Sequence, residues 1–277
     1  MRGAIRGLTR GMGTVGFRAA DHFMKTFSLL TLGTVTLLAL TACHEPGGGD
    51  DNTLTDAEKS AGWQLLFNGK DFSGWHNFHF SDVAPGWQVT NGALVCWNPQ
   101  LAGDIVTSNQ YSWFELQLDY NISEEGNSGV LYHVVGEEHK DWPTWVTGPE
   151  CQLLDNVKGH DAEPRQMSGW LYGLYQPPID PKTGKPLDAT KPVGEWNHIR
   201  LLITPEKCEH DMNGVKYFEY VLHSDDFNTR VKNSKFGQMP PYAKSDTGAI
   251  ALQGDHGAIS FRNIKIRPIT PGAAAKP

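Results

Sequence analysis

From Trp63 onward, the chain is divided into short apolar or alternating runs by Gly, Asn, Asp and Pro. Runs of about four to eight residues bounded in this way are typical of β-strands. The dipeptides Asn91-Gly92 and Asn213-Gly214 lie between such runs and predict tight hairpins of type I′. We expect strands over 63–67, 87–90, 93–97, 105–108, 114–121, 128–134, 150–154, 170–175, 197–204, 207–212, 215–222, 248–252 and 259–268.

This pattern constrains the fold class. Many short strands with few helices predict an all-β protein, in which two antiparallel sheets pack as a β-sandwich or jelly roll. The 30 glycines agree with a chain rich in turns. No repeat of propeller-like period is visible. The expected helical segments are short: one turn over 55–60, with Thr55 as its N-cap, and a surface helix over 225–234.

The N-terminal region has the pattern of an export signal. Met24 and Lys25 precede an apolar run that ends in small residues before Cys43, and the run is short for a membrane span. Residues 40–43 resemble the bacterial lipobox, which predicts lipidation of Cys43 and an exported protein anchored in the cell envelope; an ordinary cleaved signal is the alternative. We expect an upstream extension and signal peptide over 1–43, a flexible tether over 44–61, one domain over 62–268 and a disordered tail over 269–277.

The charge disfavours one class of partner. Removing residues 1–42 takes away five Lys and Arg residues and one Asp, which changes the net charge from −7 to −11. Such a surface repels phosphate backbones, so we expect no nucleic-acid partner. A neutral sugar suffers no such repulsion.

The cysteines and histidines show no metal-ligand spacing. If Cys43 is lipidated, three cysteines remain, and the sequence does not fix which pair, if any, is bridged. No Cys-x-x-Cys or His-x-x-x-His occurs, and we expect no metal and no cofactor. Sandwiches of this kind can hold a structural Ca²⁺, but no ligand loop here argues for one.

The run 148–156 offers the first candidate site. Strand alternation places Glu150 and Gln152 on one face and Cys151 on the other, which suggests a polar groove beside a core. Asp155 joins that face only if a bulge changes the alternation. The alternative is a strand end with solvated acids.

Two more runs carry polar or aromatic side chains. In 127–133, Asn127 begins the run, and Tyr132 and His133 are expected on opposite faces, one of them facing the groove. In 169–175, Trp170 and Tyr172 share one parity and form a candidate platform for stacking on sugar rings. Core packing is the alternative for each aromatic residue.

Further candidates lie upstream of the aromatic run and near the end of the chain. Arg165 could reach ligand oxygens with its planar guanidinium. Gln253 and His256 belong to a Gly-flanked polar cluster after a strand. His256 is the best imidazole candidate for proton transfer near neutral pH, with an ordinary turn as the alternative.

Together these segments resemble the 3-keto-disaccharide hydrolase domain family over about residues 62–268. Nine motifs occur in the family's order: LFNGKDFSGW at 66–75, WQVTNGAL at 87–94, NSG at 127–129, ECQLLD at 150–155, GEWN at 194–197, MNG at 212–214, SKF at 234–236, GAIALQ through DHG at 248–257, and FRNIKI at 261–266.

The resemblance implies a concanavalin-A-like or laminarinase-like jelly roll that acts on 3-keto-disaccharides or other 3-keto-glycosides. It further implies a di- or oligosaccharide ligand and a sugar-oxidising dehydrogenase acting upstream. The spacing Glu150-x-Gln152-x-x-Asp155 also looks like the Glu-x-Asp-x-x-Glu strand of laminarinase-type glycosidases, with Gln and Asp in place of two acids.

We therefore expect Glu150, His256 and Asp155 to be catalytic. The expected substrate-binding residues are Asn127, Tyr132, His133, Gln152, Arg165, Trp170, Tyr172 and Gln253. Two alternatives stay open: a non-catalytic carbohydrate-binding lipoprotein, and a conventional laminarinase-type glucanase.

Overall fold

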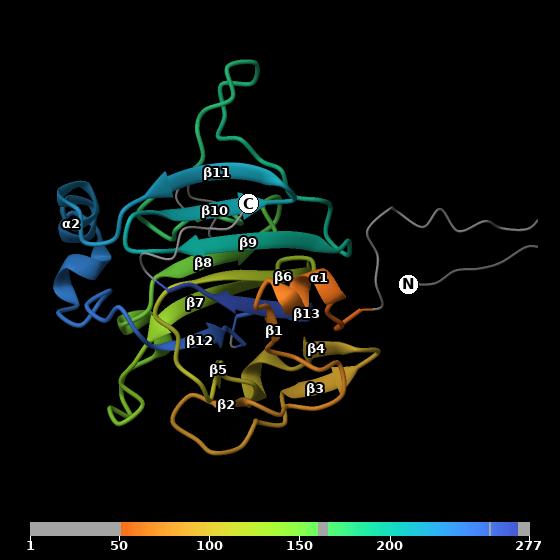
Figure 1. The fold of residues 1–277 in the computed structure, drawn as a ribbon. Helices are drawn as coiled ribbons and strands as arrows, with labels where there is room; N and C mark the ends of the chain where they lie inside the picture. Colours follow the sequence, from red (N-terminus) through yellow and green to blue (C-terminus); the bar gives the residue numbers. More distant parts are fainter. Residues whose placement is uncertain (1–50, 160–165, 255, 271–277) are drawn as a thin grey trace, which may run out of the picture. The chain divides into compact units, whose positions relative to one another are not determined.

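The computed structural model describes residues 51–159, 166–254 and 256–270 (Figure 1). Cys43 and the signal segment lie outside these ranges, as does Arg165, so the lipid anchor and the envelope location stay predictions. Within the described ranges, no helix is long and apolar enough to cross a bilayer.

Two antiparallel sheets form the domain, which confirms the predicted all-β sandwich. The larger sheet contains β1 (Gln64–Leu65), β3 (Trp87–Thr90), β4 (Ala93–Cys96), β6 (Phe114–Ile122), β9 (Asn197–Ile203), β10 (Cys208–Met212), β11 (Val215–Tyr220) and β13 (Ile259–Pro268). The smaller sheet contains β2 (Trp75–Asn77), β5 (Ile105–Thr107), β7 (Asn127–Val134), β8 (Glu150–Leu154) and β12 (Ala249–Leu252). The short helices lie before or between the strands: α1 (Asp56–Ser60), η1 (Pro99–Leu101), η2 (Thr144–Val146), α2 (Asp225–Lys232) and η3 (Lys235–Gln238).

The strand order is β11-β10-β9-β6-β13-β4-β3 in the larger sheet, with β1 also paired to β13, and β2-β5-β12-β7-β8 in the smaller one. Both predicted hairpins form, between β3 and β4 and between β10 and β11. Asn91 and Gly92 have φ values of 51° and 74°, and Asn213 and Gly214 have 49° and 80°. Positive φ at both central residues is what a type I′ turn requires.

The main core lies between the sheets. It takes Leu116 and Leu118 from β6, Val130 and Tyr132 from β7, and Cys151 and Leu153 from β8, all of them buried. Cys96, Cys151 and Cys208 are buried and unbridged. Packing of this core, and not a disulfide, holds the described sheets together.

The expected strand over 170–175 does not form. Leu171 and Tyr175 exchange backbone hydrogen bonds in a tight turn, with isolated bridges in place of a strand. Before the turn and at its start, the chain pairs with the open edge of β8: Gly169 N donates to Gln152 O, and Tyr172 N donates to Glu150 O. We call residues 169–175 the strap, because they cover an edge that would otherwise expose unpaired backbone.

The prediction of a flexible tether over 44–61 is wrong for residues 51–61, because this part of the chain packs against the larger sheet. Asn52 is buried, and its backbone N and side-chain Oδ1 exchange hydrogen bonds with Asn263. The predicted Thr55 cap is present, with a capping box that pairs Thr55 and Glu58 at the start of α1. Polar side chains in this segment therefore contact the domain, where composition alone indicated a flexible chain.

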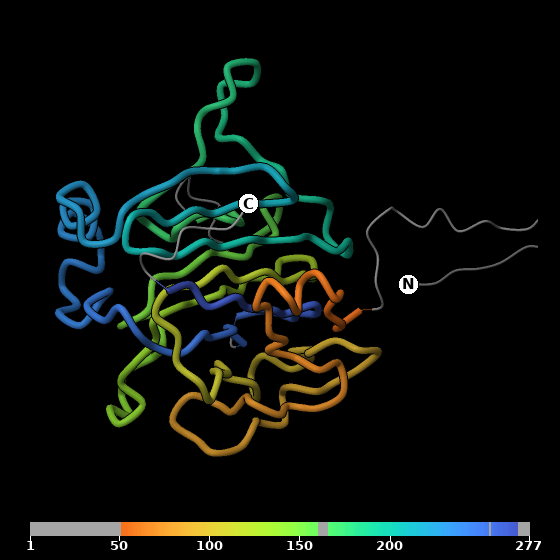
Figure 2. The backbone as a smooth tube through the Cα atoms, in the orientation of Figure 1, coloured from red at the N-terminus to blue at the C-terminus, as the bar shows by residue number. Residues whose placement is uncertain are grey.

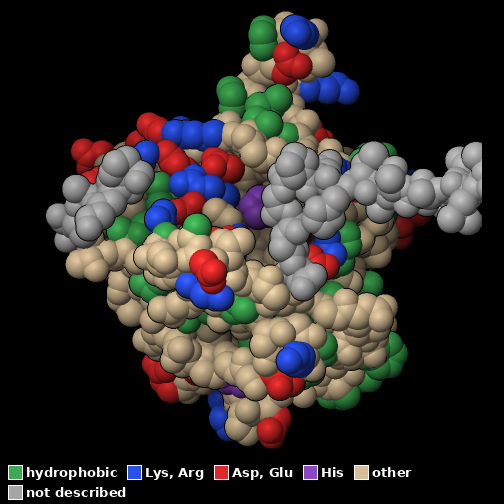
Figure 3. All heavy atoms as spheres, turned by 45° about the vertical axis from the view of Figure 1, so that its right-hand side comes forward, with side chains coloured by type: hydrophobic (Ala, Val, Ile, Leu, Met, Phe, Trp, Pro, Cys, Tyr) green, Lys and Arg blue, Asp and Glu red, His purple; other side chains and the backbone are tan. Residues whose placement is uncertain are grey.

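The segment 176–192 leaves the body as a protruding loop in the backbone trace of Figure 2. Its tip is closed by backbone hydrogen bonds: Asp180 N donates to Lys185 O at 2.8 Å, and Gly184 N donates to Asp180 O at 2.8 Å. On the face drawn in Figure 3, acidic and basic side chains are interspersed, without a large block of one sign.

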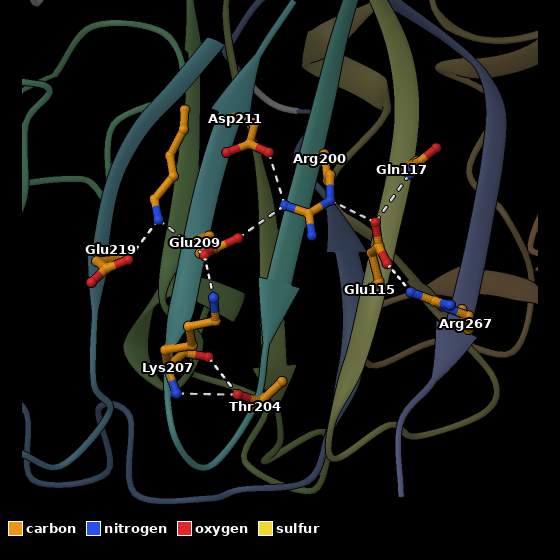
Figure 4. Close-up of polar contacts among 10 residues, drawn as sticks. Glu115, Gln117, Arg200, Thr204, Lys207, Glu209, Asp211, Glu219 and Arg267 are labelled. Atoms are coloured by element: carbon orange, nitrogen blue, oxygen red, sulfur yellow. Dashed lines mark hydrogen bonds and ion pairs between the residues drawn. The ribbon is translucent and has the colours of Figure 1, made fainter. Parts of the chain in front are cut away.

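An ion network crosses the outer face of the larger sheet (Figure 4). The Arg200 guanidinium donates from Nε to Glu115 at 2.6 Å, and from Nη1 to Glu209 at 3.1 Å and to Asp211 at 2.8 Å. Burial raises the pKa of Glu209, but hydrogen bonds from Lys207, Lys216 and Arg200 outweigh it and lower this pKa to about 2. The network joins β6, β9 and β10 across their backbone ladders.

Replacing Arg200 with Met should lower the free energy of unfolding at pH 7 by about 1–3 kcal/mol, because two largely buried carboxylates lose a charged donor. The native pKa of Glu209 lies below its ordinary value of 4.5. Its stabilising contribution is therefore present above pH 4.5 and is lost as the pH falls toward about 2. Urea unfolding between pH 7 and 3 should show a smaller acid-induced loss in R200M than in the wild type. An equal acid-induced loss of stability in both proteins would contradict the stabilising role assigned to Arg200.

Candidate active site

The site lies on the smaller sheet, at a position where one residue, Gly129, has no side chain. Gln253 N donates to Gly129 O at 3.0 Å, and Gly129 lies opposite Gln152 on β8. The residues Gln253, Gly129 and Gln152 therefore form one row across three adjacent chain segments. Because Gly129 has no side chain, the centre of this row is a hollow between two amides.

The carboxyl group of Glu150 occupies part of that hollow. A Cβ atom built on Gly129 would lie 2.3 Å from Glu150 Oε1, far inside van der Waals contact. Glu150 is 6% exposed, although it lies on the outer face of the sheet. Gly129 is needed here because a neighbouring side chain, that of Glu150, approaches its Cα closely.

Gln152 contributes an unsatisfied acceptor beside Glu150. Its Nε2 donates to Asn127 Oδ1 at 3.0 Å, while its buried Oε1 has no hydrogen-bond partner among the described residues. A buried acceptor of this kind costs free energy unless a ligand or water supplies a donor. The position of Gln152 therefore favours a site that receives hydroxyl groups.

Side chains from separate segments build the walls of the resulting cavity, whose volume is about 170 Å³. Its lining consists of Asn127, Trp145, Glu150, Gln152, Tyr172, Lys235, Gln253 and His256. Tyr172 comes from the strap, Trp145 from η2 and Lys235 from η3.

Lys235 lies above an aromatic surface. Its Nζ is 4.2 Å from the ring centroid of Tyr172, 5.3 Å from that of Trp145 and 5.2 Å from that of Phe236. Cation–π attraction holds an ammonium over such faces. The cavity therefore combines one cation, one carboxylate, one imidazole, three amides and two aromatic walls. This set can move protons and stabilise a developing oxyanion beside a hydroxylated ligand.

The structure brings together six of the predicted site residues, namely Asn127, Glu150, Gln152, Tyr172, Gln253 and His256. The predicted alternation of β8 is confirmed, because Cys151 and Leu153 belong to the core. Trp145 and Lys235 were missed. Lys235 lies in the SKF motif, which could have pointed to it, whereas Trp145 lies in η2, in a stretch of sequence with no comparable motif.

Asp155 does not line the cavity that contains Glu150, so the prediction that these two acids act together is wrong. It lines a different cavity, and its carboxylate accepts backbone hydrogen bonds from Glu125, Val157 and Lys158 at 3.0–3.1 Å. Burial raises the pKa of Asp155, but these bonds outweigh it and keep the pKa below its ordinary value. Asp155 closes a turn, and Glu150 is the one carboxylate among the described residues that line the site.

Three aromatic predictions are also corrected, since their side chains are buried away from the cavity. Tyr132 points into the core, where its hydroxyl bonds that of Tyr220. His133 has a φ of 55°, and its Nε2 bonds Ser112 O at 2.6 Å; burial lowers its pKa. Trp170 belongs to the core, because the strap turns instead of continuing as a strand.

No group of three His, Cys, Asp or Glu side chains with metal-binding geometry occurs within 51–159, 166–254 and 256–270. The predicted absence of a metal or other cofactor stays a prediction.

The fold and site together define a jelly-roll sandwich with a polar pocket on the outer face of its smaller sheet. Residues 62–267 match the family model described as a 3-keto-alpha-glucoside-1,2-lyase-like domain. The chain belongs to this family, which confirms the resemblance drawn from the nine motifs.

Individual relatives agree with this placement. The chain is 28% identical to a 3-keto-disaccharide hydrolase of Bacteroides thetaiotaomicron over 236 residues, covering 74% of this chain and 78% of that one. A crystal structure from Parabacteroides distasonis, of a protein described as a candidate glycosyl hydrolase, is 36% identical, with a TM-score of 0.71 and coverage of 79% of this chain and 100% of that one. A second such structure from the same species is 27% identical, with a TM-score of 0.55 and coverage of 75% and 99%.

The contact between Gly129 and Glu150 predicts a specific coupling. Gly129→Ala should lower the free energy of unfolding by about 1–3 kcal/mol, because the added methyl group overlaps the Glu150 carboxyl. In a Glu150→Ala background the overlap is absent, so the same substitution should cost much less. Denaturant unfolding of the four proteins in this double-mutant cycle measures the coupling. An equal cost in both backgrounds would show that the overlap is not the cause.

Proposed function

We propose that this protein is a carbohydrate-active hydrolase that cleaves 3-keto-disaccharides or related 3-keto-glycosides. The observation that carries the proposal is that one buried carboxylate, Glu150, and one ammonium, that of Lys235, line the same cavity together with three amides. The family match and the named relative from Bacteroides thetaiotaomicron support the substrate class.

A single carboxylate suits the chemistry of a 3-keto sugar. The ketone acidifies the proton on C2, and the oxygen on C1 lies β to the carbanion formed there. Glu150 removes the C2 proton, and the electron pair passes into an enolate whose oxygen is the former C3 carbonyl. The enolate then re-forms the ketone as the C1–O bond breaks, and the leaving oxygen takes a proton from His256. Water adds across the resulting C1–C2 double bond, so the net reaction is hydrolysis.

The other side chains of the cavity fit the charges that develop. The Lys235 ammonium and the cavity amides stabilise the enolate oxygen. Tyr172 and Trp145 offer faces for the C–H groups of a sugar ring, in place of the platform expected from Trp170. Elimination followed by hydration would also account for relatives described both as lyase-like and as hydrolases.

The substrate implies a partner reaction. A 3-keto-glycoside arises when a secondary alcohol of a sugar is oxidised, so an upstream sugar-oxidising dehydrogenase would supply it. If Cys43 is lipidated, both the sugar and its cleavage belong to the cell envelope.

A conventional retaining glucanase needs a second carboxyl group about 5–5.5 Å from the first. Asp155, the residue expected for that role, lines another cavity. This placement favours the elimination route over the glucanase alternative.

The protein should release free sugar from 3-keto-trehalose and none from trehalose. Glu150→Gln should lower turnover by about 10²–10⁴-fold, because the amide cannot accept the C2 proton. Glu138→Gln, at an exposed carboxylate outside the cavity, is the matched control and should retain full activity. Sugar release is measured by chromatography. Tight binding without product would support a non-catalytic sugar-binding protein, and release of sugar from an unoxidised β-glucan would support the glucanase.

Lys235→Met keeps the aliphatic stem but removes the charge that would stabilise the enolate. We expect kcat to fall by about 10²–10³-fold, as when one oxyanion donor is lost, with a smaller change in KM. Lys232→Met, which removes an equal charge from the nearby α2 without touching the cavity, should leave kcat unchanged. Equal effects of the two substitutions would indicate a general charge effect instead of a local one.

A further inference from the structure

The cavity around Glu150 is small for a disaccharide. Its volume of about 170 Å³ lies below the roughly 300–1,000 Å³ typical of small-molecule sites. It has room for the ring that reacts, so the remainder of a larger substrate must extend beyond the walls.

A second cavity of about 560 Å³ lies next to the first. Tyr172 and Lys235 line the small cavity, while Gly173 and Ser234, their immediate neighbours in the chain, line the large one. The two segments also meet in space, because the ring of Tyr172 packs edge-on against Phe236 at 6.2 Å. The Tyr172 and Lys235 region therefore forms the boundary between the two cavities.

The wall of the large cavity is fixed by contacts between α2 and the strap. Arg230 donates from Nη1 to Leu174 O at 3.1 Å and from Nε to Asp226 at 2.9 Å. Its guanidinium lies 4.3 Å from the ring centroid of Tyr175, whose hydroxyl also bonds Asp226. These contacts hold the two sides of the cavity at a set separation, so a ligand would meet a preformed site.

The remaining lining of the large cavity contains both polar and apolar side chains, which suits a sugar because a sugar has hydroxyl groups and C–H faces. Gln176, Thr229 and Asn233 present exposed amide and hydroxyl groups, while Pro177, Pro178 and Ile179 present an apolar surface. Among the described lining residues there is no carboxylate. Such a surface can hydrogen-bond hydroxyl groups and contact the C–H face of a ring.

We infer that this large cavity binds the second unit of the substrate, the sugar on the leaving-group side of the bond that is cut. The inference rests on the proposed function for the identity of the first unit. In this assignment, the protein distinguishes a disaccharide from a glycoside with a small leaving group. The residues that make the distinction are Gln176, Asn233 and the surface of residues 177–179.

Two variants test the assignment. In Asn233→Trp, an indole fills the cavity at a residue whose φ of −91° any L-residue can adopt. In Gln176→Ala/Asn233→Ala, two amides are removed at exposed positions. Gln238→Ala, an exposed amide on η3 that lines neither cavity, is the matched control.

We expect both variants to raise KM for a 3-keto-disaccharide by about tenfold or more, the equivalent of one or two hydrogen bonds. Their kcat/KM for methyl 3-keto-glucoside, which has no second unit, should stay within twofold of the wild type, and Gln238→Ala should change neither. Equal effects on both substrates, or no effect on the disaccharide, would overturn the assignment.

Binding measured in a Glu150→Gln background separates this inference from the proposed function. If the wild type cleaves neither ketone, the proposed reaction is wrong. Calorimetric Kd values for the 3-keto-disaccharide and the methyl 3-keto-glucoside then still decide the assignment. A selective weakening of the disaccharide in Asn233→Trp supports it, and failure of both ligands to bind overturns it.

Discussion

The two-residue alternation of β7 and β8 is the constraint on which both the core and the site depend. On the inner face, Val130, Tyr132, Cys151 and Leu153 close the space between the sheets. The outer face of the same strands carries Asn127, Gly129, Glu150 and Gln152. A register shift of one residue would exchange these faces and bury the acid in the core. Core packing therefore fixes the direction in which the polar residues point.

The site also depends on the absence of a side chain at Gly129. Its missing side chain gives the Glu150 carboxyl a place on the sheet, and the buried Oε1 of Gln152 adds an unsatisfied acceptor beside it. The unsatisfied amide oxygen of Gln152 reduces stability when no ligand is bound, since it is buried without a hydrogen-bond donor. Strong pairing elsewhere, such as the Arg200 network on the other sheet, offsets such costs. The protein thus combines a larger sheet crossed by an ion network with a smaller sheet that carries the polar residues of the cavity.

The walls of the site come from segments that are not strands. The strap, η2 and η3 supply Tyr172, Trp145 and Lys235. The strap is held by backbone hydrogen bonds to β8, so the edge that places Glu150 also places Tyr172. In our proposal, this arrangement holds one sugar ring against Glu150 and directs the rest of the substrate toward α2. The same loops would then determine substrate choice, while the strands determine the chemistry.

The sequence by itself determined most strand positions, the two Asn-Gly hairpins, and the shared face of Glu150 and Gln152. These are local properties, since alternation and turn chemistry act over a few residues. The nine ordered motifs also predicted the family. Sequence reasoning failed at Asp155, Tyr132, His133 and Trp170, where parity or type suggested a site.

Only the tertiary structure decided those positions. Asp155 closes a turn after β8 ends, His133 has a left-handed backbone conformation, and Trp170 lies in the strap before its turn. Packing also brought Lys235 to Tyr172 from more than sixty positions away in the chain. No periodicity specifies contacts at such separation, because they depend on how the loops fold back over the sheet. The sequence therefore determined which residues the strands offer, and the tertiary structure decided which side chains meet.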